Sequence, residues 1–140
     1  CKWTSSDCCK SASVELIIPV PGEGKVSDDR HRYYFQSLGK LADAFLPNQT
    51  HESFLATIYS DGENRSIRAF VEQLGDSRFR YKATDGRESN WGHVQTRAGI
   101  LESDAEFIVR MNCDNEPFPE YLEALLSGFT STIDATLWIA

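Results

Sequence analysis

The chain has 140 residues, of which 41% are hydrophobic and 11% aromatic, so it can bury the core of one globular domain and is not disordered in composition. Its net charge of −7 disfavours nucleic-acid binding, which depends on neutralising phosphates with Lys and Arg. No apolar run approaches the roughly eighteen residues that a membrane span needs. The sequence therefore predicts a polar arm over 1–12 and a single domain over 13–140.

The first half of the domain predicts a strand, a helix and a second strand. Residues 13–20 are β-rich, and a loop over 21–25 follows them. Ser27 is a candidate N-cap for a helix that Pro47 ends, and residues 51–60 form a strand with two mostly apolar faces, as expected for a central strand. The helix presents apolar residues at spacings of four, three and four: Tyr34, Leu38, Leu41 and Phe45.

Residues 65–74 fit two different structures. At helical spacing they form an amphipathic helix that Gly75 ends and that a capping box from Ser60 to Glu63 could begin. At period two they form the second strand of a hairpin. We prefer the strand, because Asp61 and Gly62 directly after a clear strand are a strong hairpin signal.

The second half predicts two more strands and a helix. Residues 78–84 alternate as in an antiparallel strand with a basic outer face, 85–92 form a polar loop around Trp91, and 105–112 form another strand. A helix opens near Pro117, and 131–140 either extend it or form a last strand. Together these elements predict an α+β fold: an antiparallel sheet of about five strands with two or three helices packed on it.

Catalytic motifs are absent from the sequence. There is no G-x-S-x-G, P-loop, H-E-x-x-H or G-x-G-x-x-G pattern, and none of His31, His51 and His93 has an evident partner. We therefore predict that the protein is not an enzyme and binds no cofactor or metal. An alternative is a small hydrolase that uses His93 or paired carboxylates. The acidic clusters lack the spacing of a calcium loop and are either solvated turns or a recognition surface: Glu102, Asp104 and Glu106, then Asp114 and Glu116.

The cysteines bear on compartment. The chain opens with Cys1, and Cys8, Cys9 and Cys113 are its other thiols. Adjacent cysteines seldom bridge each other, so we predict a disulfide from Cys8 or Cys9 to Cys113, which would tie the arm to the domain in an oxidising compartment. The alternative is a set of reduced thiols in a cytosolic protein.

An N-terminal Cys1, a polar tether and an acidic domain without catalytic motifs resemble a mature bacterial periplasmic lipoprotein. Within that group the chain resembles the immunity proteins made against effectors of the type VI secretion system, and the stretch SVELIIPVPGEG before a helix is similar to lipoproteins of Mog1/PsbP-like fold. The resemblance implies lipidation of Cys1, a periplasmic location with membrane contact only through that lipid, and an otherwise monomeric chain. A secreted protein is the fallback.

The same resemblance implies that the protein binds a cognate toxin hydrolase and blocks its active site. A Trp suits an interface anchor, and acidic side chains suit a basic cleft. A structural or chaperone-like envelope lipoprotein is the alternative. The expected partner-binding residues are Trp91, His93, Glu102, Asp104, Glu106, Asp114 and Glu116.

Overall fold

The fold is built on a sheet of four parallel strands. A computed structural model describes residues 13–24, 26–86 and 92–129. In these ranges the strand order is β3-β2-β1-β4, and every neighbouring pair is parallel. The strands are β1 (Val14–Pro21), β2 (Phe54–Asp61), β3 (Phe79–Ala83) and β4 (Phe107–Arg110). The fold is therefore α/β, and the predicted α+β fold with an antiparallel sheet of about five strands is wrong.

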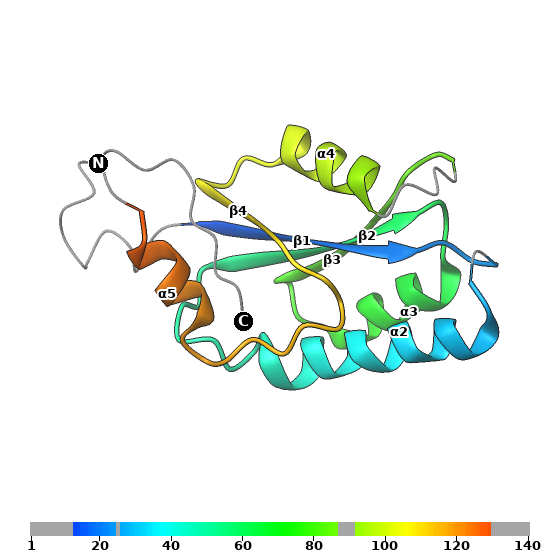
Figure 1. Cartoon of the computed structure of the whole chain (residues 1–140), viewed down its shortest axis with the longest axis horizontal. Coiled ribbons are helices and arrows are strands. Elements are labelled where there is room, and N and C mark those ends of the chain that lie inside the picture. Colours follow the sequence, from blue (N-terminus) through cyan, green and yellow to red (C-terminus); the bar gives the residue numbers. More distant parts are fainter. Residues whose placement is uncertain (1–12, 25, 87–91, 130–140) are drawn as a thin grey trace.

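Helices cover both faces of the sheet. Figure 1 shows α2 and α3 on one face and α4 on the other. The helices are α2 (Asp28–Lys40), continued by the π-helix η1 (Leu41–Phe45), then α3 (Arg65–Leu74), α4 (His93–Glu102) and α5 (Tyr121–Ser127). None of the described helices is long and apolar enough to cross a bilayer.

The fold class was predicted wrongly because residues 65–74 form α3 and not a strand. Asn64, rather than a box from Ser60 to Glu63, is the N-cap, and its side chain accepts a hydrogen bond from the backbone N–H of Ile67. Gly75 ends the helix in the left-handed conformation, with φ of 65°. A helix between two strands supplies the crossover that parallel pairing needs, so β3 lies parallel to β2.

Helix α4 was not predicted, because its large apolar side chains do not mark its buried face. Gln95 and Gly99 are buried, whereas Ile100 and Leu101 are 49% and 72% exposed. A Cβ on Gly99 would lie 2.6 Å from Cδ1 of Ile17, so this helix packs closely on β1 through a residue without a side chain.

The main core lies between the sheet and α2, η1 and α3. β1 is buried on both faces, which accounts for its continuous apolar sequence. Two predictions are confirmed: the cap at Ser27 and a central strand over most of 51–60. The core includes Leu16, Ile18, Leu38, Leu41, Ile58, Ile67, Leu122 and Leu126.

Candidate functional site

The carboxyl ends of the four strands define one edge of the sheet. Because all pairs are parallel, the strands end toward the same edge: Pro21 lies opposite Asp61, and Ala83 ends one position earlier, opposite Ser60. The shorter β4 ends at Arg110, which lies opposite Ile17, four residues before the end of β1. The strand order runs outward from β1 to β3 and then returns to β4 on the other side of β1. In open α/β sheets, ligands bind outside the carboxyl ends at the point where the order reverses. The candidate site therefore lies beside the ends of β1 and β4.

Three helices begin at or near this edge. α2 and α3 follow β1 and β2 through short loops, and the N-cap of α4, Gly92, packs against Pro19 of β1. The first backbone N–H groups of a helix have no intrahelical acceptor and carry a partial positive charge. The edge thus offers hydrogen-bond donors to an anion although the whole chain is acidic.

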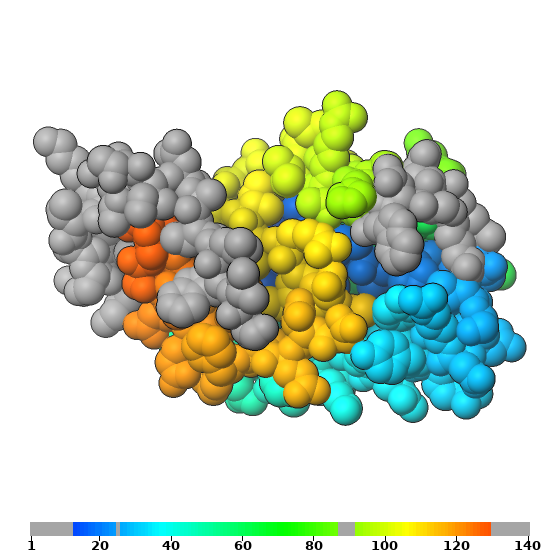
Figure 2. Space-filling model, in the orientation of Figure 1, coloured from blue at the N-terminus to red at the C-terminus, as the bar shows by residue number. Residues whose placement is uncertain are grey.

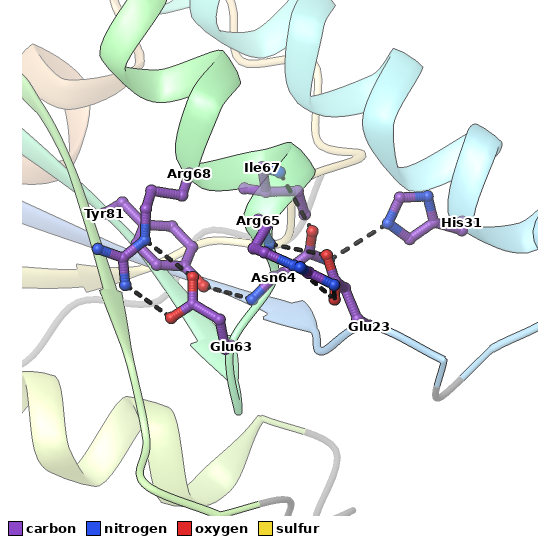
Figure 3. A network of polar contacts seen from close by, with 8 residues as sticks. All are labelled: Glu23, His31, Glu63, Asn64, Arg65, Ile67, Arg68 and Tyr81. Atoms are coloured by element: carbon purple, nitrogen blue, oxygen red, sulfur yellow. Dashed lines mark hydrogen bonds and ion pairs between the residues drawn. The ribbon is translucent and has the colours of Figure 1, made fainter.

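Asn64 organises the part of the edge between β1, α2 and α3 (Figure 3). It is fully buried, and its Nδ2 donates to the carbonyl of Pro21 at 3.0 Å and lies 3.3 Å from Nε2 of His31. Its backbone N–H donates to the hydroxyl of Tyr81 at 2.7 Å. One side chain therefore ties the end of β1, the start of α3 and the first turns of α2 together.

Two ion pairs flank Asn64 at the surface (Figure 3). Arg65 pairs with Glu23 at 3.4 Å, and Arg68 pairs with Glu63 at 2.6 Å. Both pairs are largely solvated, and exposed pairs contribute about 0–1 kcal/mol. They position the loops after β1 and β2 more than they stabilise the fold.

Asp61 and Gln95 form a buried polar pair at the end of β2. The Nε2 of Gln95 donates to Oδ1 of Asp61 at 3.1 Å, and the residues are 1% and 8% exposed respectively. The Oε1 of Gln95 is buried without a hydrogen-bond donor among the described residues. An unsatisfied buried acceptor costs about 1–3 kcal/mol, so it is ordinarily matched by a partner such as a ligand N–H or O–H group.

Glycines let the backbone segments approach each other at this edge. A Cβ on Gly22 would lie 2.1 Å from the carbonyl oxygen of Asp61, so only glycine fits beside the end of β2. Gly92 has φ of 80°, and a Cβ there would lie 2.6 Å from Cβ of Pro19. The N-terminus of α4 is thereby held directly against the end of β1.

The loop after β4 brings Asp114 and Cys113 near α2. The hydroxyl of Tyr33 donates to Oδ2 of Asp114 at 3.3 Å. Cys113 is a buried free thiol whose pKa is raised to about 12, first by burial and then by the charge of Asp114. The described residues contain no group of three or more His, Cys, Asp or Glu side chains that could hold a metal ion.

The opposite, amino edge of the sheet has an open cavity of about 400 Å³, whose lining includes Glu15, Phe54, Arg80 and Asp104. Glu15 is buried there, and its Oε1 accepts hydrogen bonds from Thr57 and Arg80, each at 2.6 Å. Burial raises the pKa of Glu15, but hydrogen bonds from Ser103, Thr57 and Arg80 outweigh burial and leave this pKa below its ordinary value. Contacts within the protein thus hold this carboxylate. The carboxyl edge is the stronger candidate, because the strand order reverses there and three helices begin near it.

The predicted partner-binding residues do not form one surface. His93 lies on the exposed first turn of α4, and Asp114 follows β4, both toward the carboxyl edge. Glu102 and Asp104 line the amino-edge cavity, and Glu106 bonds to Ser13 there. Exposed Glu116 lies farther along the loop after Asp114. Trp91 lies outside the described residues, as do Cys1, Cys8 and Cys9, so lipidation and the disulfide stay predictions.

Sequence reasoning missed Asp61, Asn64, Gln95 and Arg110. The signal for the first two was present, because Asn64 and Gly75 bracket a helix of ordinary length. Accepting that helix would have made Asp61 the end of a parallel strand and not a turn residue. Gln95 had no comparable signal, because α4 lacks an apolar stripe. Arg110 lies in a predicted strand, but the predicted antiparallel sheet gave no reason to place it near a site.

Comparison with family models and with curated proteins gave no match. Among solved structures, the fold is similar to the crystal structure of S. aureus TarS, with a TM-score of 0.59 and 15% sequence identity. The similarity covers 82% of this chain and 19% of TarS. The chain thus spans about a fifth of that protein, and the likeness concerns the fold.

Proposed function

We propose that the protein binds the nucleotide part of an activated sugar, as the donor-binding domain of a sugar-transfer enzyme. The observation that carries this proposal is the buried pair of Asp61 and Gln95 at the carboxyl edge, where Oε1 of Gln95 has no donor in the part of the chain that the structure describes. Two neighbouring acceptors suit the N–H groups of a base or the hydroxyls of a ribose. In nucleotide-binding α/β folds, an acidic residue commonly accepts from a ribose hydroxyl.

The arrangement of the edge supports the same ligand class. The site lies where the strand order reverses, and helices begin there with unpaired N–H groups that favour phosphate. S. aureus TarS, whose structure is similar, is a glycosyltransferase. A glycosyltransferase needs an activated donor sugar, and nucleoside diphosphates are common carriers. The fold alone does not imply this activity, so the proposal depends on the site.

Calorimetric titration with nucleosides, nucleoside diphosphates and nucleotide sugars tests the proposal. We expect one nucleoside series to bind to the wild type and Asp61→Asn to weaken it on the order of tenfold, because the variant replaces a charged acceptor by a neutral one. Glu52→Gln, at the amino-edge cavity, is the control and should bind as the wild type does. Failure of every series to bind the folded wild type contradicts the proposal, and unchanged binding by Asp61→Asn places the site elsewhere.

This proposal departs from the prediction of a non-enzymatic inhibitor of a secreted hydrolase. That earlier prediction stays untested, as do the periplasmic location, the lipid anchor and the monomeric state. Co-purification from lysed cells tests it separately, because an immunity protein should recover one hydrolase in a stoichiometric complex. No observation on the described residues favours a second function.

A further inference from the structure

Arg110 is a cation near the candidate site, and it takes no part in the hydrogen bond between Asp61 and Gln95. It is the last residue of β4, exposed, and in no ion pair among the residues that the structure describes. Most arginines of the described ranges have a carboxylate within ion-pair distance: Arg32, Arg65, Arg68, Arg78 and Arg80. In a chain of net charge −7, an arginine near the strand reversal with no carboxylate partner among the described residues suits an anionic ligand.

The guanidinium of Arg110 lies beside the N-terminus of α4. A Cβ placed on Gly92, the N-cap, would lie 3.9 Å from Nη2 of Arg110. No side chain caps this helix, and Thr96 is the residue whose N–H donates back to the carbonyl of Gly92, at 2.9 Å. The N–H groups of residues 93–95 therefore have no acceptor within the helix. A cationic fork and a helix N-terminus converge on the same place.

Gln95 is a second, independent feature of this turn. It belongs to the first turn of α4, is 1% exposed, and its Oε1 has no donor within the described ranges. The Nε2 of Gln95 donates a hydrogen bond to the carboxylate of Asp61. A ligand at this turn would thus meet acceptors near Asp61 and donors near Gly92 and Arg110, which suits a molecule with an N–H or O–H part and an anionic part.

We propose that Arg110 and the first turn of α4 bind the phosphate groups of the nucleotide, while Asp61 and Gln95 bind its nucleoside part. The inference rests on the proposed function and assigns the two ends of the ligand. Phosphate is repelled by the carboxylate of Asp61, whereas the guanidinium can donate two parallel hydrogen bonds to phosphate oxygens. In Figure 2 the segment that contains β4 reaches the surface between α4 and α2, so a ligand can approach it.

The test compares Arg110→Gln with Arg97→Gln. Both variants remove one positive charge. Arg97 is exposed on α4, beyond the first turn of that helix. Calorimetry at one ionic strength would use uridine, adenosine, guanosine and cytidine, their 5′-diphosphates, and inorganic pyrophosphate. We expect the preferred diphosphate to lose on the order of 10- to 100-fold in affinity in Arg110→Gln. Binding of the bare nucleoside should not change, and Arg97→Gln should bind as the wild type does.

Arg110→Lys separates charge from geometry and should lie between the wild type and Arg110→Gln, because a lysine keeps the charge and loses the fork. The inference is overturned if the wild type binds nucleoside and diphosphate equally, or if Arg97→Gln loses as much as Arg110→Gln. Binding of pyrophosphate that depends on Arg110, without binding of any nucleoside, keeps the phosphate-binding role of Arg110 but overturns the nucleoside role of Asp61 and Gln95 and the proposed function. Absence of all binding by the folded wild type removes both.

Discussion

Replacing Asn64 tests whether one buried side chain holds the carboxyl edge together. Asn64→Ala removes the N-cap of α3, a change that costs about 0.5–2 kcal/mol. It also removes the donor to the part-buried carbonyl of Pro21, and leaving such an acceptor unsatisfied costs up to about 1–3 kcal/mol. The hydroxyl of Ser60 also donates to this carbonyl, but at 3.5 Å it compensates weakly. We expect a loss of about 2–4 kcal/mol in the free energy of unfolding.

Urea denaturation followed by circular dichroism measures this loss, with Ser27→Ala as the matched control. Ser27 caps α2 at the surface through a single bond of 3.4 Å, so its removal should cost about 1 kcal/mol or less. Asn64→Ser keeps an acceptor for Ile67 but is too short to bridge to Pro21 as well, and should lie between the two. A loss in Asn64→Ala no larger than in Ser27→Ala would refute the reasoning.

Three further predictions concern packing, pH and thiol reactivity. Gly92→Ala should destabilise the protein more than Gly75→Ala in thermal unfolding. Both glycines have positive φ, which costs about 1–2 kcal/mol for alanine, but only an alanine at position 92 would also clash with β1. Equal losses in the two variants would contradict this. Because the pKa of Glu15 is lowered on folding, its carboxylate stabilises the fold above the ordinary pKa of 4.5, and this stabilisation is lost as pH falls through the folded pKa. The urea midpoint of Glu15→Gln should therefore fall less in acid than that of the wild type. Parallel pH profiles of the two proteins would contradict this. Cys113, buried with a pKa raised to about 12, should react with a thiol reagent only on unfolding, as mass mapping of that cysteine with and without urea would show; fast labelling of the native chain would contradict its burial.

The sequence predicted individual elements better than their assembly. The strands around residues 13–20 and 51–60 and the helix after Ser27 follow from apolar periodicity and capping, and the structure has all three. The direction of pairing depended on residues 65–74, whose apolar spacing suits either period. Choosing a hairpin there made the whole sheet antiparallel, and the correct helix makes it parallel.

The candidate site was harder to predict because it is formed by tertiary contacts. Asp61 and Gln95 are 34 positions apart and meet only when α4 packs on the sheet. That packing uses Gly92 and Gly99, where the absence of a side chain permits close approach. Apolar patterns report large buried side chains, so contacts made by glycine and a buried amide leave no trace in them.

Amide chemical-shift mapping by NMR, with a nucleoside diphosphate titrated into labelled protein, tests the central claim most directly. We predict saturable shifts concentrated on the backbone amides of 61–64 and 93–96, at the end of β2 and the first turn of α4. The amides of Ser13, Glu52 and Ala105 at the amino-edge cavity should stay unchanged. Shifts that concentrate at that cavity, or no shifts with any of the four diphosphates, would contradict a nucleotide site at the carboxyl edge.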